Sequence, residues 1–264
     1  MAFFKAGSRT FHYSDRTVGT GPTLVLANSL GTDFRIWDPL LPKLKGIGRI
    51  VRYDKRGHGL TDVSEPPYSI QDLSADLKII TDHAGLDRFL LGGVSIGGMI
   101  AQDYAARYPE QVDALVCMDT APKIGEAALW QDRIDAISAN GLESIADGVM
   151  ERWFSAAFRK NNPAATAGWR NLLARTTQAG YLGCCAAIRD ADLTEATLSL
   201  TVPTLVLCGA EDGATPPALV KAMADAMKNA SYVEVPDAGH IPSLEQPDFL
   251  ADAMISFFKA NGFV

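Results

Sequence analysis

The stretch LLGGVSIGG, residues 90–98, decides the fold of this 264-residue chain. An apolar strand pattern runs directly into Gly93-Val94-Ser95-Ile96-Gly97, and a helical pattern follows over residues 99–108. Glycines two positions before and two positions after Ser95 permit a sharp turn and close packing of the helix. Such a turn lifts a serine hydroxyl out of the sheet, where a base and backbone N–H groups can reach it. The stretch therefore predicts a nucleophile elbow. The alternative is an ordinary glycine-rich turn with an incidental serine.

The composition predicts a soluble globular protein. Hydrophobic residues make up 47% of the chain, which is enough for a substantial core. No apolar run reaches the length of about 18 residues that a membrane helix needs, and residues 1–15 turn polar too early for a signal peptide. A cytoplasmic location is therefore the default expectation. The formal charge of −7 argues against a nucleic-acid partner, which needs a basic face.

The four cysteines show no metal-ligand spacing, and nothing in the sequence predicts a metal or an organic cofactor. Cys117 and Cys208 lie in apolar strand patterns, where a thiol usually acts as a small core residue. Cys184 and Cys185 are adjacent, and a reactive thiol there is a possible alternative, although no histidine is near them in sequence.

Strand and helix patterns alternate from Thr23 onward, which is typical of a parallel sheet with crossover helices. An antiparallel pair is expected at the edge, around residues 10–15. The other predicted strands cover 23–27, 49–53, 89–94, 114–119, 204–209 and 232–235. The core helical patterns cover 69–83, 99–108, 217–227 and 247–260.

The alternation stops after Thr120 and resumes near Thr204. Helical patterns fill this interval, and no convincing strand occurs in it. An all-helical insertion over residues 122–196 is therefore expected in a core formed by residues 1–121 and 197–264. The helical patterns of the insertion cover 127–140, 142–158 and 164–179.

Functional side chains are expected directly after the predicted strands, since ligands gather beyond the carboxyl ends of a parallel sheet. Ser95 follows one strand and His240 follows the last. A hydrolytic serine needs a histidine as base, and the histidine needs a carboxylate to fix its tautomer. His240 is the best placed of the four histidines, with a loop histidine that caps the next helix as the alternative. Glu211, Asp212 and Asp237 compete for the role of the acid.

An oxyanion hole requires two N–H donors beside the serine. The backbone N–H of Ile96, the residue after the nucleophile, supplies one of them. The other should come from the loop after the first central strand, Asn28-Ser29-Leu30-Gly31, with the Leu30 N–H as the candidate.

Over its whole length, the chain resembles the α/β-hydrolase superfamily. The resemblance implies a mostly parallel eight-stranded sheet with the helical insertion as a cap on the active face; a helical domain elsewhere is the alternative. The order Ser, Asp, His favours Asp212 as the acid, with Glu211 facing solvent. Many relatives have His-Gly where this chain has Asn28-Ser29, a departure that leaves the backbone donor intact. The segments that carry the resemblance are 28–31, 54–59, 93–98, 209–212 and 237–240.

Within the superfamily, the cap looks like that of 3-oxoadipate enol-lactonases. This resemblance implies hydrolysis of a five-membered enol-lactone with a carboxymethyl arm to 3-oxoadipate, in bacterial aromatic degradation. An arginine should hold the free carboxylate, and Arg133 and Arg189 are the candidates, each alternatively a solvated charge. Trp130 lies one helical turn before Arg133, as a substrate contact or as a core residue of the cap. The similar segments are 119–125, 151–154, 180–190 and 214–217.

Other functions fit the same residues. A carboxylesterase, a cofactor-free haloperoxidase-like enzyme and a C–C bond hydrolase all use such a triad. Dehalogenases and epoxide hydrolases need an aspartate where Ser95 stands, so they are disfavoured. In a different class, a ligand receptor on the same fold remains an alternative.

Overall fold

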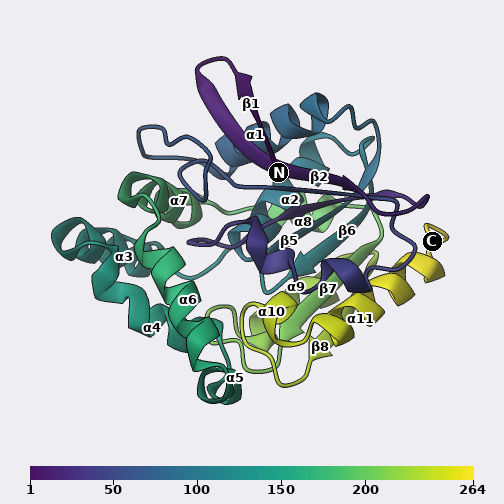
Figure 1. The fold of residues 1–264 in the computed structure, drawn as a ribbon. Helices are drawn as coiled ribbons and strands as arrows, with labels where there is room; N and C mark the ends of the chain where they lie inside the picture. Colours follow the sequence, from purple (N-terminus) through teal and green to yellow (C-terminus); the bar gives the residue numbers. More distant parts are fainter.

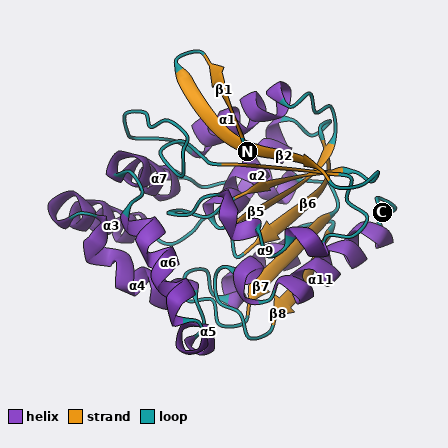
Figure 2. Cartoon of the chain, in the orientation of Figure 1, coloured by secondary structure: helices purple, strands orange, loops and turns teal.

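The computed structural model describes residues 1–264 and forms one eight-stranded sheet with helices on both faces (Figures 1 and 2). The strands are β1 (Ala2–Ala6), β2 (Arg9–Thr17), β3 (Thr23–Ala27), β4 (Arg49–Tyr53), β5 (Phe89–Val94), β6 (Val112–Met118), β7 (Thr204–Gly209) and β8 (Ala230–Val235). Their order is β1-β2-β4-β3-β5-β6-β7-β8. Only β1–β2 and β2–β4 pair antiparallel. The predicted α/β fold with its antiparallel edge is confirmed.

The order in which successive strands join the sheet reverses at β3. The chain passes from β3 to β4 on one side, and then from β4 through α1 (Ile70–His83) to β5 on the other side. Since crossover connections are right-handed, the connection after β3 and α1 lie on opposite faces. The carboxyl ends of β3 and β5 thus border a crevice of the kind in which open α/β sheets bind ligands.

The core helices follow from local sequence signals. Ser69 accepts a hydrogen bond from the Asp72 N–H, and the Asp72 carboxylate accepts one from the Ser69 N–H, which is a capping box that starts α1. α2 (Ile96–Arg107) packs against α1, α8 (Thr194–Ser199), β5 and β6. α9 (Pro217–Ala226) covers β7 and β8, and α11 (Pro247–Ala260) lies against β8 and the 3-10 turn Leu41–Lys43.

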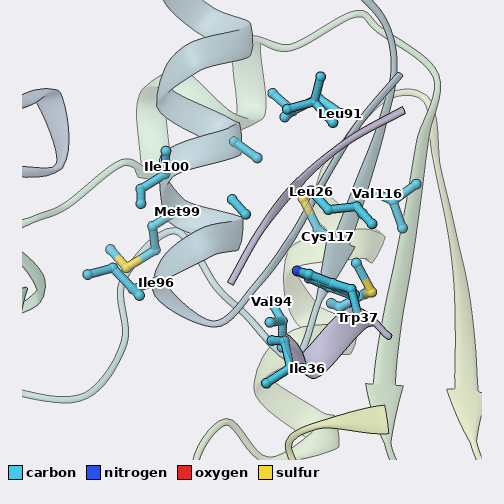
Figure 3. Close-up of a cluster of buried hydrophobic side chains, with 14 of the residues drawn as sticks. Leu26, Ile36, Trp37, Leu91, Val94, Ile96, Met99, Ile100, Val116 and Cys117 are labelled. Atoms are coloured by element: carbon cyan, nitrogen blue, oxygen red, sulfur yellow. The ribbon is translucent and has the colours of Figure 1, made fainter. Parts of the chain in front are cut away.

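The central strand and its helix are buried throughout. Every residue of β5 is buried, as are the first ten residues of α2. Side chains from β3, β5, β6 and α2 and the turn that contains Trp37 gather in the core between them (Figure 3). This close packing holds the Ser95 turn in place, because a densely packed core has low compressibility.

All helices between β6 and α8 lie in one layer beyond the carboxyl ends of the strands (Figure 1). The single helical pattern expected over 142–158 is divided, because Phe154 is extended and Ser155 caps a new helix by accepting from the Phe158 N–H. The pattern expected over 164–179 is also divided, because Thr177 caps another helix. The helices of this layer are α3 (Ala127–Asn140), α4 (Ala146–Trp153), α5 (Ala156–Asn161), α6 (Pro163–Ala174) and α7 (Gln178–Asp190).

None of the helices combines the length and the apolar character that crossing a membrane would require.

Candidate active site

Ser95 occupies a sharp turn between β5 and α2. Its φ of 59° and ψ of −125° lie in a region that non-glycine residues rarely adopt. A Cβ on Gly93 would overlap the Gly97 backbone, and a Cβ on Gly97 would overlap the Ala27 carbonyl. Only glycines fit these two positions. The close approach of the backbone at the strained turn therefore accounts for the two glycines of the sequence pattern.

His240 is held by Asp212. The Nδ1 of His240 lies 2.9 Å from Oδ2 of Asp212, and both side chains are buried. Because the carboxylate accepts, this contact places the proton on Nδ1 and leaves Nε2 free to act as a base. Burial disfavours the charged form of Asp212, but the facing His240 and donors from Thr215 and Ala214 outweigh it and hold the pKa of Asp212 below its ordinary value.

The other two candidate acids do not approach His240. Glu211 and Asp237 are both exposed, and neither hydrogen-bonds to the histidine. Asp237 has a φ of 52° and lies in the turn that leads from β8 to His240. Of the three acids that the sequence left open, the structure brings Asp212 to the histidine.

Ser95 and His240 both line a cavity of about 760 Å³ beneath the cap. No hydrogen bond joins the two side chains in this structure, a looseness that is common without substrate. The remaining residues that line the cavity are Ser29, Leu30, Ile124, Gly125, Leu129, Trp130, Asp132, Arg133, Ser144, Ile145, Gly148, Val149, Arg152, Trp153, Tyr181, Gly213, Ala214 and Thr215.

The two predicted oxyanion donors come from neighbouring strands. Ala27 at the end of β3 pairs with Gly93 of β5, so the loop that contains Leu30 lies beside the Ser95 turn. Leu30 lines the cavity, and its N–H donates to no acceptor in the protein. Ile96 is the first residue of α2, where a backbone N–H has no partner within the helix.

Two arginines of the cap open into the cavity. Arg133 extends from α3, with its guanidinium 5.1 Å from the centre of the Trp130 ring, and Arg152 extends from α4. Tyr181 lines the same cavity, and burial raises the pKa of its hydroxyl although the charges of Arg133 and Arg152 act to lower it. The ion pairs of the cap are formed by Lys123, Arg170 and Arg189, whereas Arg133 and Arg152 form none.

Of the other two predicted substrate contacts, Trp130 lines the cavity and Arg189 does not. Trp130 lines the cavity and donates from Nε1 to the Ile124 carbonyl at 2.6 Å, so it also fixes the start of α3. Arg189 lies outside the cavity, where it pairs with Asp190 and donates to Gln131 at 2.6 Å. Sequence reasoning missed Arg152.

The loop of His240 is bonded to the cap. The His240 N–H donates to the Trp153 carbonyl at 2.8 Å. Glu245 accepts from the Gly239 N–H at 2.7 Å and from the Ser155 hydroxyl at 2.7 Å, and burial raises the pKa of this carboxyl. The start of α5 and the His240 loop are therefore a single hydrogen-bonded unit, which sequence reasoning did not reveal.

A second buried acid lies beside the Asp212–His240 pair. Asp119 follows β6 with a φ of 47°, and its Oδ1 accepts from the Gly209 N–H at 2.8 Å. Its other oxygen has no hydrogen-bond partner, and ligand atoms of Cys208 and Asp212 lie within 4.8 Å. Burial and the charge of Asp212 raise the pKa of Asp119 well above its ordinary value, and burial also raises that of Cys208. The surroundings of this group therefore favour the protonated forms of Asp119 and Cys208 and the ionised form of Asp212.

Cys184 and Cys185 are both buried in α7. Burial raises the pKa of Cys184 to about 12 and also raises the pKa of Cys185. A thiol that is protonated at neutral pH is a poor nucleophile. We therefore interpret both cysteines as packing residues of α7.

The comparisons with known proteins agree with this geometry. Residues 22–247 match the family model of the alpha/beta hydrolase fold. The chain is 32% identical to 3-oxoadipate enol-lactonase 2 of Acinetobacter baylyi over 95% of this chain and 91% of that protein. It is also 32% identical to 3-oxoadipate enol-lactonase 1 of the same organism, over 90% of this chain and 89% of that protein.

Among solved structures, the crystal structure of the enol-lactonase from Burkholderia xenovorans LB400 superposes with a TM-score of 0.93 at 33% identity. The match covers 98% of this chain and 100% of that one. The serine turn, the histidine–aspartate pair, the sheet order and the sequence similarity lead to one conclusion: the chain belongs to the α/β hydrolase family, and within it resembles the 3-oxoadipate enol-lactonases.

Proposed function

We propose that this chain opens 3-oxoadipate enol-lactone to 3-oxoadipate by serine hydrolysis. The observation that carries the proposal is the pair Arg133 and Arg152, which face the cavity of Ser95 and have no acidic partner in the protein. A substrate carboxylate supplies that partner, because the planar guanidinium matches it with two N–H donors. The similarity to enol-lactonases supports a lactone as the group beside the serine.

The cap and the core divide the recognition of such a substrate. Arg133 and Arg152 belong to cap helices, whereas Ser95 belongs to the core. A carboxylate held by the cap therefore leaves the ring at the other end of the molecule against the serine. The chain has a formal charge of −7 and Asp132 also lines the cavity, so an anion is attracted to this site only by the two local arginine charges.

In the proposed reaction, Ser95 Oγ attacks the lactone carbonyl while His240 Nε2 takes the hydroxyl proton. Asp212 stabilises the imidazolium, and the N–H groups of Leu30 and Ile96 donate to the oxyanion. The ring C–O bond then breaks, and its electron pair leaves on the enol oxygen. The enolate takes up at carbon the proton that His240 accepted from Ser95 and becomes the ketone, which leaves His240 neutral again. A water molecule deprotonated by His240 attacks the acyl-enzyme and releases Ser95.

The residues perform every one of these steps without a cofactor. We place the reaction in the cytoplasm, in the breakdown of aromatic compounds, because the resemblance to enol-lactonases implies that setting.

The test is a comparison of purified protein on three substrates: the enol-lactone, the same lactone with its free carboxylate methylated, and p-nitrophenyl acetate. We expect kcat/KM for the lactone to exceed that for the acetate ester by about 100-fold or more. Methylation removes the charge and adds one methyl group at the end of the molecule remote from the lactone, so it should raise KM strongly and change kcat little. A preference for p-nitrophenyl acetate would overturn the lactone and leave an esterase. Equal KM values for the two lactones would overturn the role of the arginines.

A further inference from the structure

The peptide between Ser29 and Leu30 is held from one side. The Ser29 carbonyl accepts three hydrogen bonds: from the Lys55 ammonium, from the Thr32 hydroxyl at 2.8 Å and from the Thr32 N–H at 3.3 Å. The Lys55 ammonium also donates to the Thr32 carbonyl at 3.4 Å. Lys55 is 1% exposed and forms no ion pair, so its charge is directed at backbone carbonyls of this loop.

The geometry of the peptide carries this contact to the active site. A trans peptide is planar, and its C=O and N–H point in opposite directions. The group that opposes the Ser29 carbonyl is the Leu30 N–H, the candidate oxyanion donor. Whatever fixes the direction of the carbonyl therefore fixes the direction of the donor.

The order of the strands places the two partners on opposite sides of this peptide. β3 lies between β4 and β5. Lys55 follows β4, Ser29 and Leu30 follow β3, and Ser95 follows β5. The Ser29 carbonyl is turned toward the side of Lys55, which leaves the N–H for the side of Ser95.

The next peptide of the loop is held by the same turn. The Gly31 N–H donates to Nε2 of His58 at 3.0 Å, and Nδ1 of His58 donates to the Arg56 carbonyl at 3.1 Å. Burial and the charge of Lys55 hold the pKa of His58 well below its ordinary value, so the ring stays neutral and Nε2 accepts. Lys55 and His58, two residues of one turn, thus form hydrogen bonds with two successive peptides of the loop.

We propose that Lys55 is a positioning residue of the oxyanion hole: its ammonium holds the Ser29 carbonyl so that the Leu30 N–H faces the carbonyl under attack at Ser95. This inference rests on catalysis by Ser95, as in the proposed function, but it does not depend on which ester or lactone is the substrate. It also explains why a buried lysine without an acidic partner occupies this position.

The main test is Lys55→Met, which keeps an unbranched side chain that is one heavy atom shorter and removes the ammonium. We expect kcat on p-nitrophenyl acetate and on the lactone to fall about 10- to 100-fold, less than the loss of a whole donor, with KM within about threefold of wild type. Binding of phenylboronic acid, whose adduct with Ser95 places an oxygen in the oxyanion hole, should weaken by a similar factor. Lys221→Met, at an exposed lysine paired with Asp225, is the matched control and should change neither quantity.

A second variant covers the case in which Lys55→Met does not fold. Thr32→Val keeps the shape of the side chain and removes another donor to the Ser29 carbonyl, so it should lower kcat about 3- to 10-fold with unchanged KM. A folded Lys55→Met with wild-type kcat would overturn the proposal. A fall in its kcat with unchanged binding of the boronic acid would also overturn it. If Lys55→Met does not fold, a wild-type kcat of Thr32→Val would overturn the proposal. If the ester follows the expected pattern and the lactone is no substrate, only the proposed substrate fails.

Discussion

Replacing Lys55 with methionine should raise the free energy of unfolding at neutral pH and abolish a pH dependence that the lysine confers. Burial lowers the pKa of Lys55 from 10.5 to about 8, although Cys184, Asp54 and Asp33 each raise it somewhat. A shift of this size corresponds to about 3 kcal/mol between the charged and neutral forms. At neutral pH the folded protein bears this cost, because the amine is charged both before and after folding.

The sign of the pH dependence follows from proton binding. Between about pH 8 and pH 10.5 the unfolded lysine is protonated while the folded one is largely neutral, so the unfolded state binds more protons and stability rises with pH. From about pH 7.5 to pH 9.5, the stability of wild type relative to Lys55→Met should therefore increase by about 2 kcal/mol. Cys184 and the other buried thiols act in the opposite direction, but they are present in both proteins and largely cancel in the difference.

Urea unfolding followed by circular dichroism at several pH values measures this difference directly. Lys55→Met should be the more stable protein at about pH 7.5 and the two should converge as the pH rises. A variant less stable than wild type at neutral pH, or a difference that does not change with pH, would refute the reasoning. Greater stability combined with lower kcat would separate a positioning role from a merely structural one, because a structural role predicts a loss of both.

Three further predictions concern the active site and its surroundings. Ser95→Ala should lower kcat roughly a millionfold for any hydrolysed substrate, as measured in steady-state assays; wild-type turnover would exclude the serine as nucleophile. Arg133→Ala and Arg152→Ala should each raise KM for the lactone about 10-fold or more without raising it for p-nitrophenyl acetate, whereas Arg189→Ala, outside the cavity, should do neither. Asp119→Asn should stabilise the protein at neutral pH, because the pKa of the folded carboxyl is raised and its contribution to stability declines as the pH rises above the unfolded pKa. In thermal unfolding the gain should shrink near pH 4. A gain that does not change with pH would contradict the raised pKa of Asp119.

The strands were predictable because burial leaves its mark on sequence. β3, β4, β5 and β7 have the predicted bounds. A strand covered on both faces is a mostly apolar run that ends at a turn, and β4 keeps this pattern at Ile50, Val51 and Tyr53 although it also contains two arginines. β6 begins two residues earlier than expected and ends before Asp119, whose positive φ breaks the extended chain. Side-chain pattern cannot reveal that break, because it depends on the contact of Asp119 with Gly209 from another strand.

The cap was predictable as helical but not in its contacts. Arg152 and Arg189 both lie on amphipathic helical patterns, and the sequence offers no reason to prefer one of them as a cavity residue. Their directions depend on how α4 and α7 pack, and Arg189 is diverted by Asp190, its immediate neighbour. The role of Lys55 was hidden for a similar reason, since its partner carbonyl lies 26 residues away in the sequence.

The cap is fastened to the core at two places that do not involve α3. In α7, Gly180 meets Gly57 so closely that a Cβ on either would overlap the other backbone, and Thr177 donates to the Gly57 carbonyl at 2.8 Å. At the other end, Ser155 is bonded to Glu245.

By contrast, α3 has a single fully buried residue, Ile137, yet it supplies Leu129, Trp130 and Arg133 to the cavity. The part of the cavity that α3 lines is therefore not bonded to the His240 loop, whereas Arg152 of α4 lies directly before Trp153, whose carbonyl accepts from the His240 N–H. Exchanging the cavity face of α3 for that of another family member should give an enzyme with altered selectivity and an intact triad, which makes this helix the natural unit for redesign.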